Sequence, residues 1–65
     1  MRTCEKLNND QWVKVDFSTL KNGDIFRQYD DGKRYIDENT RDNVWVAKSN
    51  AYINNIGVWV IETLN

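Results

Sequence analysis

The chain of 65 residues carries 9 Lys+Arg against 10 Asp+Glu, a formal net charge of −1, so it lacks the strong positive field that draws proteins to nucleic acid or anionic lipid. One cysteine and no histidine exclude an internal disulfide and the usual zinc folds, and hydrophobic residues, at 40%, suffice for one small domain. No stretch approaches the roughly 20 apolar residues of a membrane span, and the N-terminus lacks the apolar run of a signal peptide, so we expect a cytoplasmic protein.

Residues 1–10 have two interpretations. The stretch CEKLNND is either an extra strand that ends in an Asn-Asn-Asp turn or an N-terminal arm that becomes ordered on a partner, and we favour the strand. Residues 11–65 then form a single β-barrel domain.

The segment QWVKVDF alternates apolar and polar side chains. This alternation predicts a half-buried strand with Val13, Val15 and Phe17 on its inner face.

The following STLKNG interrupts the strand pattern. We expect Ser18 to cap a single helical or 3-10 turn whose Leu20 points inward. Gly23 then supplies the left-handed residue that ends the turn, and a new strand begins after it.

The stretch IFRQYDDGKRYI predicts a β-hairpin whose turn contains Gly32. The loop can have two residues or three. A three-residue loop with a left-handed glycine in a bulge pairs Phe26 with Ile36 and keeps both on the core face, so we predict this register. It also gathers a basic and aromatic group on the outer face: Arg27, Tyr29, Lys33 and Tyr35, with Arg34 near the inward-facing rim.

This basic and aromatic group has two interpretations. Contacts between a cation and a tyrosine ring stabilise a hairpin by roughly 0.5–1 kcal/mol each without any ligand. The same combination binds nucleic acid on other small barrels, by stacking on bases and by attraction to phosphates. The structural interpretation explains the group adequately, so nucleic-acid binding is the less favoured hypothesis.

Two later segments, NVWVAK (residues 43–48) and GVWVIET (57–63), have consecutive apolar residues, as strands do that are covered on each face or lie against another subunit. We expect residues 49–56 to form an ordered loop anchored by Tyr52 or Ile53. Either the tryptophans or the neighbouring valines stay exposed as an apolar patch, unless this loop or the N-terminal arm covers them. The interface residues predicted in this way are Trp45, Val58, Trp59 and Val60.

About five strands at regular spacing predict a mainly β fold, a small closed or nearly closed barrel with one short helical or 3-10 turn. We do not expect an enzyme, because the chain has no histidine and no pair of carboxylates within an apolar run. Cys4 has no histidine to activate it, and DDGKRYIDEN lacks the acidic spacing of a calcium loop. The sequence therefore predicts no catalytic residue, no metal and no cofactor.

Taken together, FSTLKNGDIFRQYDDGKRYID, VWVAKSNAY and GVWVIE resemble short proteins of phages and prophages of Gram-positive bacteria. The shared pattern is Leu-Lys-x-Gly-Asp-x-Phe-Arg, an acidic glycine turn, a Ser-x-x-Tyr loop and a closing Gly-x-Trp, and it spans residues 12–62. This resemblance implies a five-stranded SH3-like barrel made inside an infected or lysogenic cell, and it assigns no functional residues.

Three functional hypotheses follow. The leading one is a non-enzymatic phage or prophage accessory protein that binds a host or phage protein, as an inhibitor of a host defence or replication factor, alone or as a homodimer. The second is a small barrel that binds nucleic acid or a nucleotide through the basic and aromatic hairpin residues. The third is a minor structural component of the virion.

Overall fold

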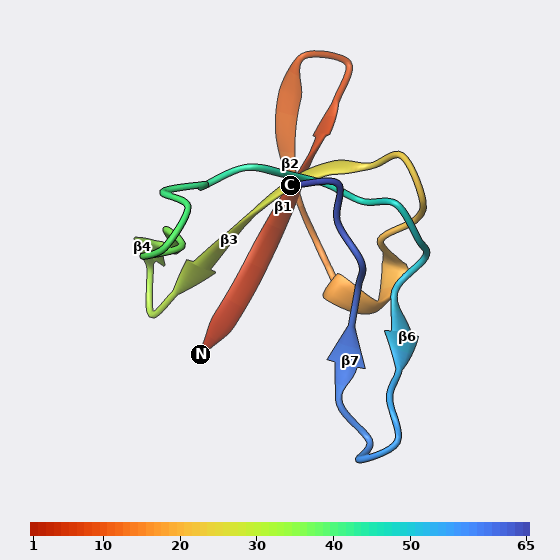
Figure 1. Cartoon of the computed structure of the whole chain (residues 1–65). Helices are drawn as coiled ribbons and strands as arrows, with labels where there is room; N and C mark the ends of the chain where they lie inside the picture. The colour runs from red at the N-terminus through yellow and green to blue at the C-terminus, as the bar shows by residue number, and fades with distance from the viewer.

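A computed structural model describes all residues, 1–65. The chain is mainly β with a single 3-10 turn, which confirms the predicted fold class (Figure 1). It contains no helix of the length and apolarity that crossing a bilayer requires. In chain order the elements are β1 (Arg2–Asn8), β2 (Gln11–Val15), η1 (Phe17–Thr19), β3 (Ile25–Asp30), β4 (Lys33–Arg34), β5 (Trp45–Val46), β6 (Tyr52–Ile53) and β7 (Trp59–Val60).

Five strands form one antiparallel sheet, and the last two form a separate hairpin. In the sheet, β1 lies between β2 and β3, and the other edge of β3 pairs with β5 near its start and with β4 at its end. The β6–β7 hairpin joins the sheet through one bridge between Ala47 and Thr63. No strand pairs with the outer edge of β2, so the strands form an open sheet with an attached hairpin rather than a closed barrel.

Residues 1–10 are a strand and a turn, as in the favoured interpretation. β1 is the longest strand and pairs with both β2 and β3. Asn9 and Asp10 both have positive φ angles, 51° and 65°, which is the geometry of a two-residue type I′ turn. Because β1 is an inner strand, the sheet formed by later residues is incomplete without this segment.

The predicted register of the β3–β4 hairpin is wrong. Asp30 pairs with Lys33, so the loop has two residues and not three. Both loop residues, Asp31 and Gly32, have positive φ angles of 51° and 83°. This type I′ turn follows the right-handed twist of the strands without a bulge, and an aspartate tolerates the left-handed conformation that it requires.

Phe26 is a core residue, but its predicted partner is not. Phe26 is 1% exposed, whereas Ile36 is 47% exposed, so the prediction of these two as interior neighbours is wrong. β4 ends at Arg34, and Phe26 pairs with Trp45 of β5 instead. A distant strand competes successfully for this edge of β3, because it brings a large indole onto the phenyl ring.

The core lies between the sheet and the 3-10 turn η1. Leu20 follows this turn, points inward as predicted and is 1% exposed. The prediction that Ser18 caps the turn is wrong, because Asp16 occupies the cap position and Ser18 lies inside η1. Val13, also predicted to face inward, is 40% exposed. The buried residues are Cys4, Leu20, Phe26, Trp45 and Ala47, and Val15, Phe17, Ala51 and Ile61 pack against them.

The predicted anchors of residues 49–56 are also wrong. Tyr52 and Ile53 form β6 and are 45% and 55% exposed. The segment is held instead at Ala51, whose backbone N–H donates to the carbonyl of Leu20 at 2.9 Å. The turn that follows is closed by the Asn54 side chain, whose Oδ1 accepts from two backbone N–H groups of the next four residues at 3.1 Å each.

Candidate functional site

Only part of the predicted basic and aromatic group comes together. Arg27 and Tyr29 share the outer face of β3, and the observed register adds Arg34 to this face while it turns Lys33 and Tyr35 to the other. The Arg34 guanidinium lies 5.9 Å from the centre of the Tyr29 ring. The predicted set of five is therefore divided between the two faces of the sheet.

Trp12, which the sequence did not predict in this group, joins Arg27, Tyr29 and Arg34 on the outer face. We call these four residues the outer-face cluster. The Arg27 guanidinium lies 4.1 Å from the centre of the Trp12 indole and 5.7 Å from that of the Tyr29 ring. The alternation in residues 11–17 places Trp12 on the outward face of its strand, and this was the only sequence signal for its position. The contact between Trp12 and Arg27 could not be predicted, because it depends on β1 lying between β2 and β3, which brings both side chains to one face of the sheet.

Glu5 neutralises the centre of this outer-face cluster. Its carboxylate accepts a hydrogen bond from Arg27 Nε at 2.7 Å. This hydrogen bond holds the pKa of Glu5 below its ordinary value. The nearby Tyr29 hydroxyl and the charges of Arg27 and Arg34 lower the pKa in the same direction, and burial opposes them. The Arg27 guanidinium is thus already paired with a carboxylate of the protein, which favours the structural interpretation of the cluster.

Replacing Glu5 with glutamine is expected to destabilise the protein at pH 7 and to reduce its sensitivity to acid. A carboxyl whose pKa is lower in the folded state contributes stability above its unfolded pKa of about 4.3, and this contribution is lost as the pH falls through the folded value. The difference in urea midpoint between wild type and Glu5→Gln should be positive at pH 7 and shrink below about pH 4.

The matched control for this measurement is Glu38→Gln, which removes an exposed carboxyl and should leave the midpoint unchanged. A Glu5→Gln deficit that is equally large in acid would contradict the role of the ionised pair.

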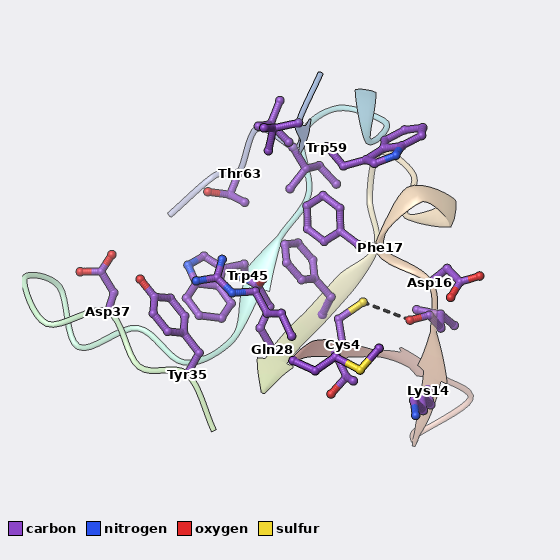
Figure 2. A pocket seen from close by; sticks show the side chains of 18 residues that line it. Cys4, Lys14, Asp16, Phe17, Gln28, Tyr35, Asp37, Trp45, Trp59 and Thr63 are labelled. Carbon is purple, nitrogen blue, oxygen red and sulfur yellow. Dashed lines mark hydrogen bonds between the residues drawn. The ribbon is translucent and has the colours of Figure 1, made fainter. Parts of the chain in front are cut away.

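The inner face of the sheet borders an open cleft of about 760 Å³. Of the 18 residues that line it, 11 are hydrophobic, so the cleft is mainly apolar. One wall comes from the start of β1 and the end of β2, and the other from residues 58–61 around β7 (Figure 2). The cleft therefore lies where the sheet and the attached hairpin meet without filling the space between them.

A row of aromatic rings runs along the cleft. The rings of Tyr35 and Trp45 stack with centroids 5.7 Å apart, Phe26 stacks on Trp45 at 6.0 Å, and Phe17 meets Phe26 edge-on at 6.3 Å. In Figure 2, Tyr35 lies at one end of the row and Trp59 at the other. The rings with substantial exposure are these two, at 36% and 44%, so they are the parts of the row that a ligand can reach.

Charged side chains border the cleft on two sides. The Arg2 guanidinium lies 5.4 Å from the centre of the Tyr35 ring, and Asp37 lies nearby. Lys14 and Asp16 line another part of the wall, away from Tyr35 in Figure 2. Charges of both signs thus border an apolar interior, as is common in sites that orient a ligand.

Cys4 lies at the cleft wall but is 3% exposed. Its thiol donates to the carbonyl of Val15 at 3.2 Å. Burial raises the pKa of the Cys4 thiol, and the negative charges of Asp16 and Glu5 raise it further. A neutral, buried thiol is a poor nucleophile, and the chain has no group of three or more histidine, cysteine, aspartate or glutamate residues that could hold a metal ion.

The predicted interface residues lie in two different environments. Trp45 is 8% exposed and belongs to the core, so its indole does not form part of an exposed interface. Val58 and Trp59 are 49% and 44% exposed, and Val60 is half-buried. The two Val-Trp-Val segments differ because β5 is part of the main sheet, whereas β7 pairs with β6 alone.

No protein-family model, no curated protein and no solved structure matches this chain, so the choice of site rests on its geometry. Of the two surfaces, the outer-face cluster is internally paired and the cleft is open. The cleft is therefore the better candidate. From the sequence, Tyr35 was predicted to belong to the basic and aromatic group and Trp59 to an interface. Arg2 and Cys4 were not predicted to line a site, because residues 1–10 have little apolar alternation from which a wall could be predicted.

Proposed function

We propose that the protein is a non-enzymatic binding domain whose cleft takes an apolar segment of another protein. The observation that carries this proposal is the open, mainly apolar volume of about 760 Å³ with exposed aromatic rings at its ends. Ligand sites in proteins are usually apolar concave spaces of about 300–1,000 Å³ with a few polar groups.

The residue types around the cleft support a protein partner. Most of the binding energy at protein interfaces comes from a few tryptophan, tyrosine and arginine side chains. Trp59, Tyr35 and Arg2 all line this cleft. The resemblance of residues 12–62 to phage and prophage proteins leads us to propose further that the partner is a host or phage protein.

Nucleic-acid binding on the outer face has less support. Arg27 already pairs with Glu5 at 2.7 Å, and the net charge of the chain is −1. A phosphate would have to compete with an ion pair that the fold itself holds in place, while few other cations add to the attraction. The cleft faces no such competition.

Selection of a displayed random peptide library against the immobilised protein tests the proposal. We expect enriched peptides rich in aromatic and aliphatic residues, whose binding changes tryptophan fluorescence, because Trp59 and Trp45 line the cleft. Trp59→Ala and Arg2→Ala should each weaken this binding at least about tenfold. The matched control is Arg34→Ala on the outer face, which should bind the peptides as wild type does.

Two results would contradict the proposal. One is a set of selected peptides that bind Trp59→Ala as tightly as wild type. The other is nuclease-sensitive capture of nucleic acid that is lost in Arg34→Ala and falls steeply with salt, which would move the function to the outer face.

A further inference from the structure

The β6–β7 hairpin and its flanks carry no charge. Residues 49–61 contain no Asp, Glu, Lys or Arg, although the chain as a whole has 19 such residues (9 + 10). The hairpin extends away from the rest of the protein, with its turn at the far end (Figure 1). Its apolar side chains are nevertheless well exposed: Tyr52 45%, Ile53 55%, Ile56 82% and Val58 49%. We call Tyr52, Ile53 and Ile56, which do not line the cleft, the hairpin patch. Tyr52 and Ile53 point to opposite faces of β6, so the patch surrounds the β6 edge and does not cover one face of the hairpin.

The hairpin also has strand edges that nothing protects. β6 and β7 pair only with each other. The other open edges of the protein, on β2 and β4, belong to strands that carry Lys14, Lys33 and Arg34. Charged side chains on an edge strand prevent pairing with another chain, and the hairpin alone lacks them.

The free part of the β6 edge begins at Ile53. The backbone N–H of Ala51 is taken by Leu20 at 2.9 Å, and that of Asn54 donates to Val58 at 2.9 Å. Because hydrogen-bonded and non-hydrogen-bonded pairs alternate in an antiparallel ladder, Ile53 directs its backbone N–H and C=O away from β7. These groups are available to a strand on the open side of β6.

We propose that the hairpin patch is a self-association surface, on which the β6 edges of two copies lie antiparallel across a twofold axis. In a twofold interface the same patch of both copies meets itself, so a patch that carries charge of one sign would repel its copy. A patch without charge avoids this repulsion and needs no countercharge from its partner. A second copy of this chain therefore satisfies both the apolar side chains and the strand edge.

The exposed area predicts a weak dimer. The exposed fractions of Tyr52, Ile53 and Ile56 correspond to roughly 350 Å² per copy, and with the turn two copies would bury at most about 900 Å². This is the lower end of specific interfaces, which associate reversibly at micromolar concentrations or above. Tyr52, Ile53 and Ile56 do not line the cleft, so the dimer leaves much of the proposed peptide site accessible.

Sedimentation velocity and light scattering of the intact chain from about 5 to about 500 µM test the inference. We expect the weight-average mass to rise from the monomer value of 7.7 kDa toward twice that value, and the amide of Ile53 to exchange more slowly at the higher concentrations. Ile53→Lys and Ile56→Lys should keep the far-UV circular dichroism of wild type and stay monomeric. The matched control is Leu64→Lys, which adds the same charge at an apolar residue 69% exposed outside the hairpin and should dimerise as wild type does.

A wild-type protein that stays at 7.7 kDa over the whole range would overturn the inference, as would a folded Ile56→Lys that still dimerises or a Leu64→Lys that does not. Peptide binding to the cleft is measured on Ile56→Lys as well. Retained peptide binding by this monomer, with loss in the cleft variants Trp59→Ala and Arg2→Ala, separates the self-association surface from the proposed function.

Discussion

Phe26→Ala should lower the free energy of unfolding by about 3–5 kcal/mol, which approaches the entire stability that a core of this size supplies. The Phe26 ring is 1% exposed and contacts Trp45 on one side and Phe17 on the other. Removing it leaves a cavity that these rings cannot close, since strand β5 holds the backbone of Trp45 and the turn η1 holds that of Phe17. Urea denaturation followed by tryptophan fluorescence should show a variant that is largely unfolded before denaturant is added.

Ile36→Ala is the matched control for Phe26, because the sequence alone places the two residues together in the core. With Ile36 47% exposed and β4 already ended at Arg34, its truncation should cost less than about 1 kcal/mol. Equal losses from the two substitutions would contradict the observed register and support the three-residue loop.

Trp45→Ala and Trp59→Ala should differ strongly, although both residues lie between two valines. Trp45 is 8% exposed and stacks on Phe26 and Tyr35, so its truncation should cost about 3–5 kcal/mol. Trp59 is 44% exposed on a hairpin outside the main sheet, so its truncation should cost about 1 kcal/mol or less. Thermal unfolding followed by circular dichroism measures both differences.

The same pair of variants separates stability from binding. Trp59→Ala should remain folded and lose peptide affinity, whereas Trp45→Ala should lose the fold itself. If Trp59→Ala proved as unstable as Trp45→Ala, the hairpin would be part of the core, and neither the open cleft nor the hairpin patch would be a surface.

The small core explains why this chain has an open cleft at all. Only five residues are buried, and two aromatic rings supply most of the buried volume. The β6–β7 hairpin joins the sheet through one bridge and a few backbone hydrogen bonds, so it covers the inner face incompletely. The unfilled space between sheet and hairpin is the proposed binding site, and the unpaired edge of β6 is the proposed self-association surface.

The sequence was sufficient where a feature depends on a few neighbouring residues. The strand at residues 11–15, the left-handed Gly23 and the inward Leu20 follow from side-chain period and allowed backbone angles, and the structure has all three, although Val13 is exposed and Phe17 lies in the 3-10 turn. The mainly β class follows from the same local signals. Burial of Phe26 was also predictable, because an aromatic residue within a strand pattern gains most from the core.

Only the tertiary structure decided which strands pair and which faces they cover. β1 separates β2 from β3, which brings Trp12 to Arg27, and β5 displaces Ile36 from the edge of β3. The same competition places Trp45 in the core and leaves Trp59 exposed. Distant segments compete for a limited number of strand edges, and the outcome depends on the total apolar area buried by each arrangement, which no local stretch of sequence contains.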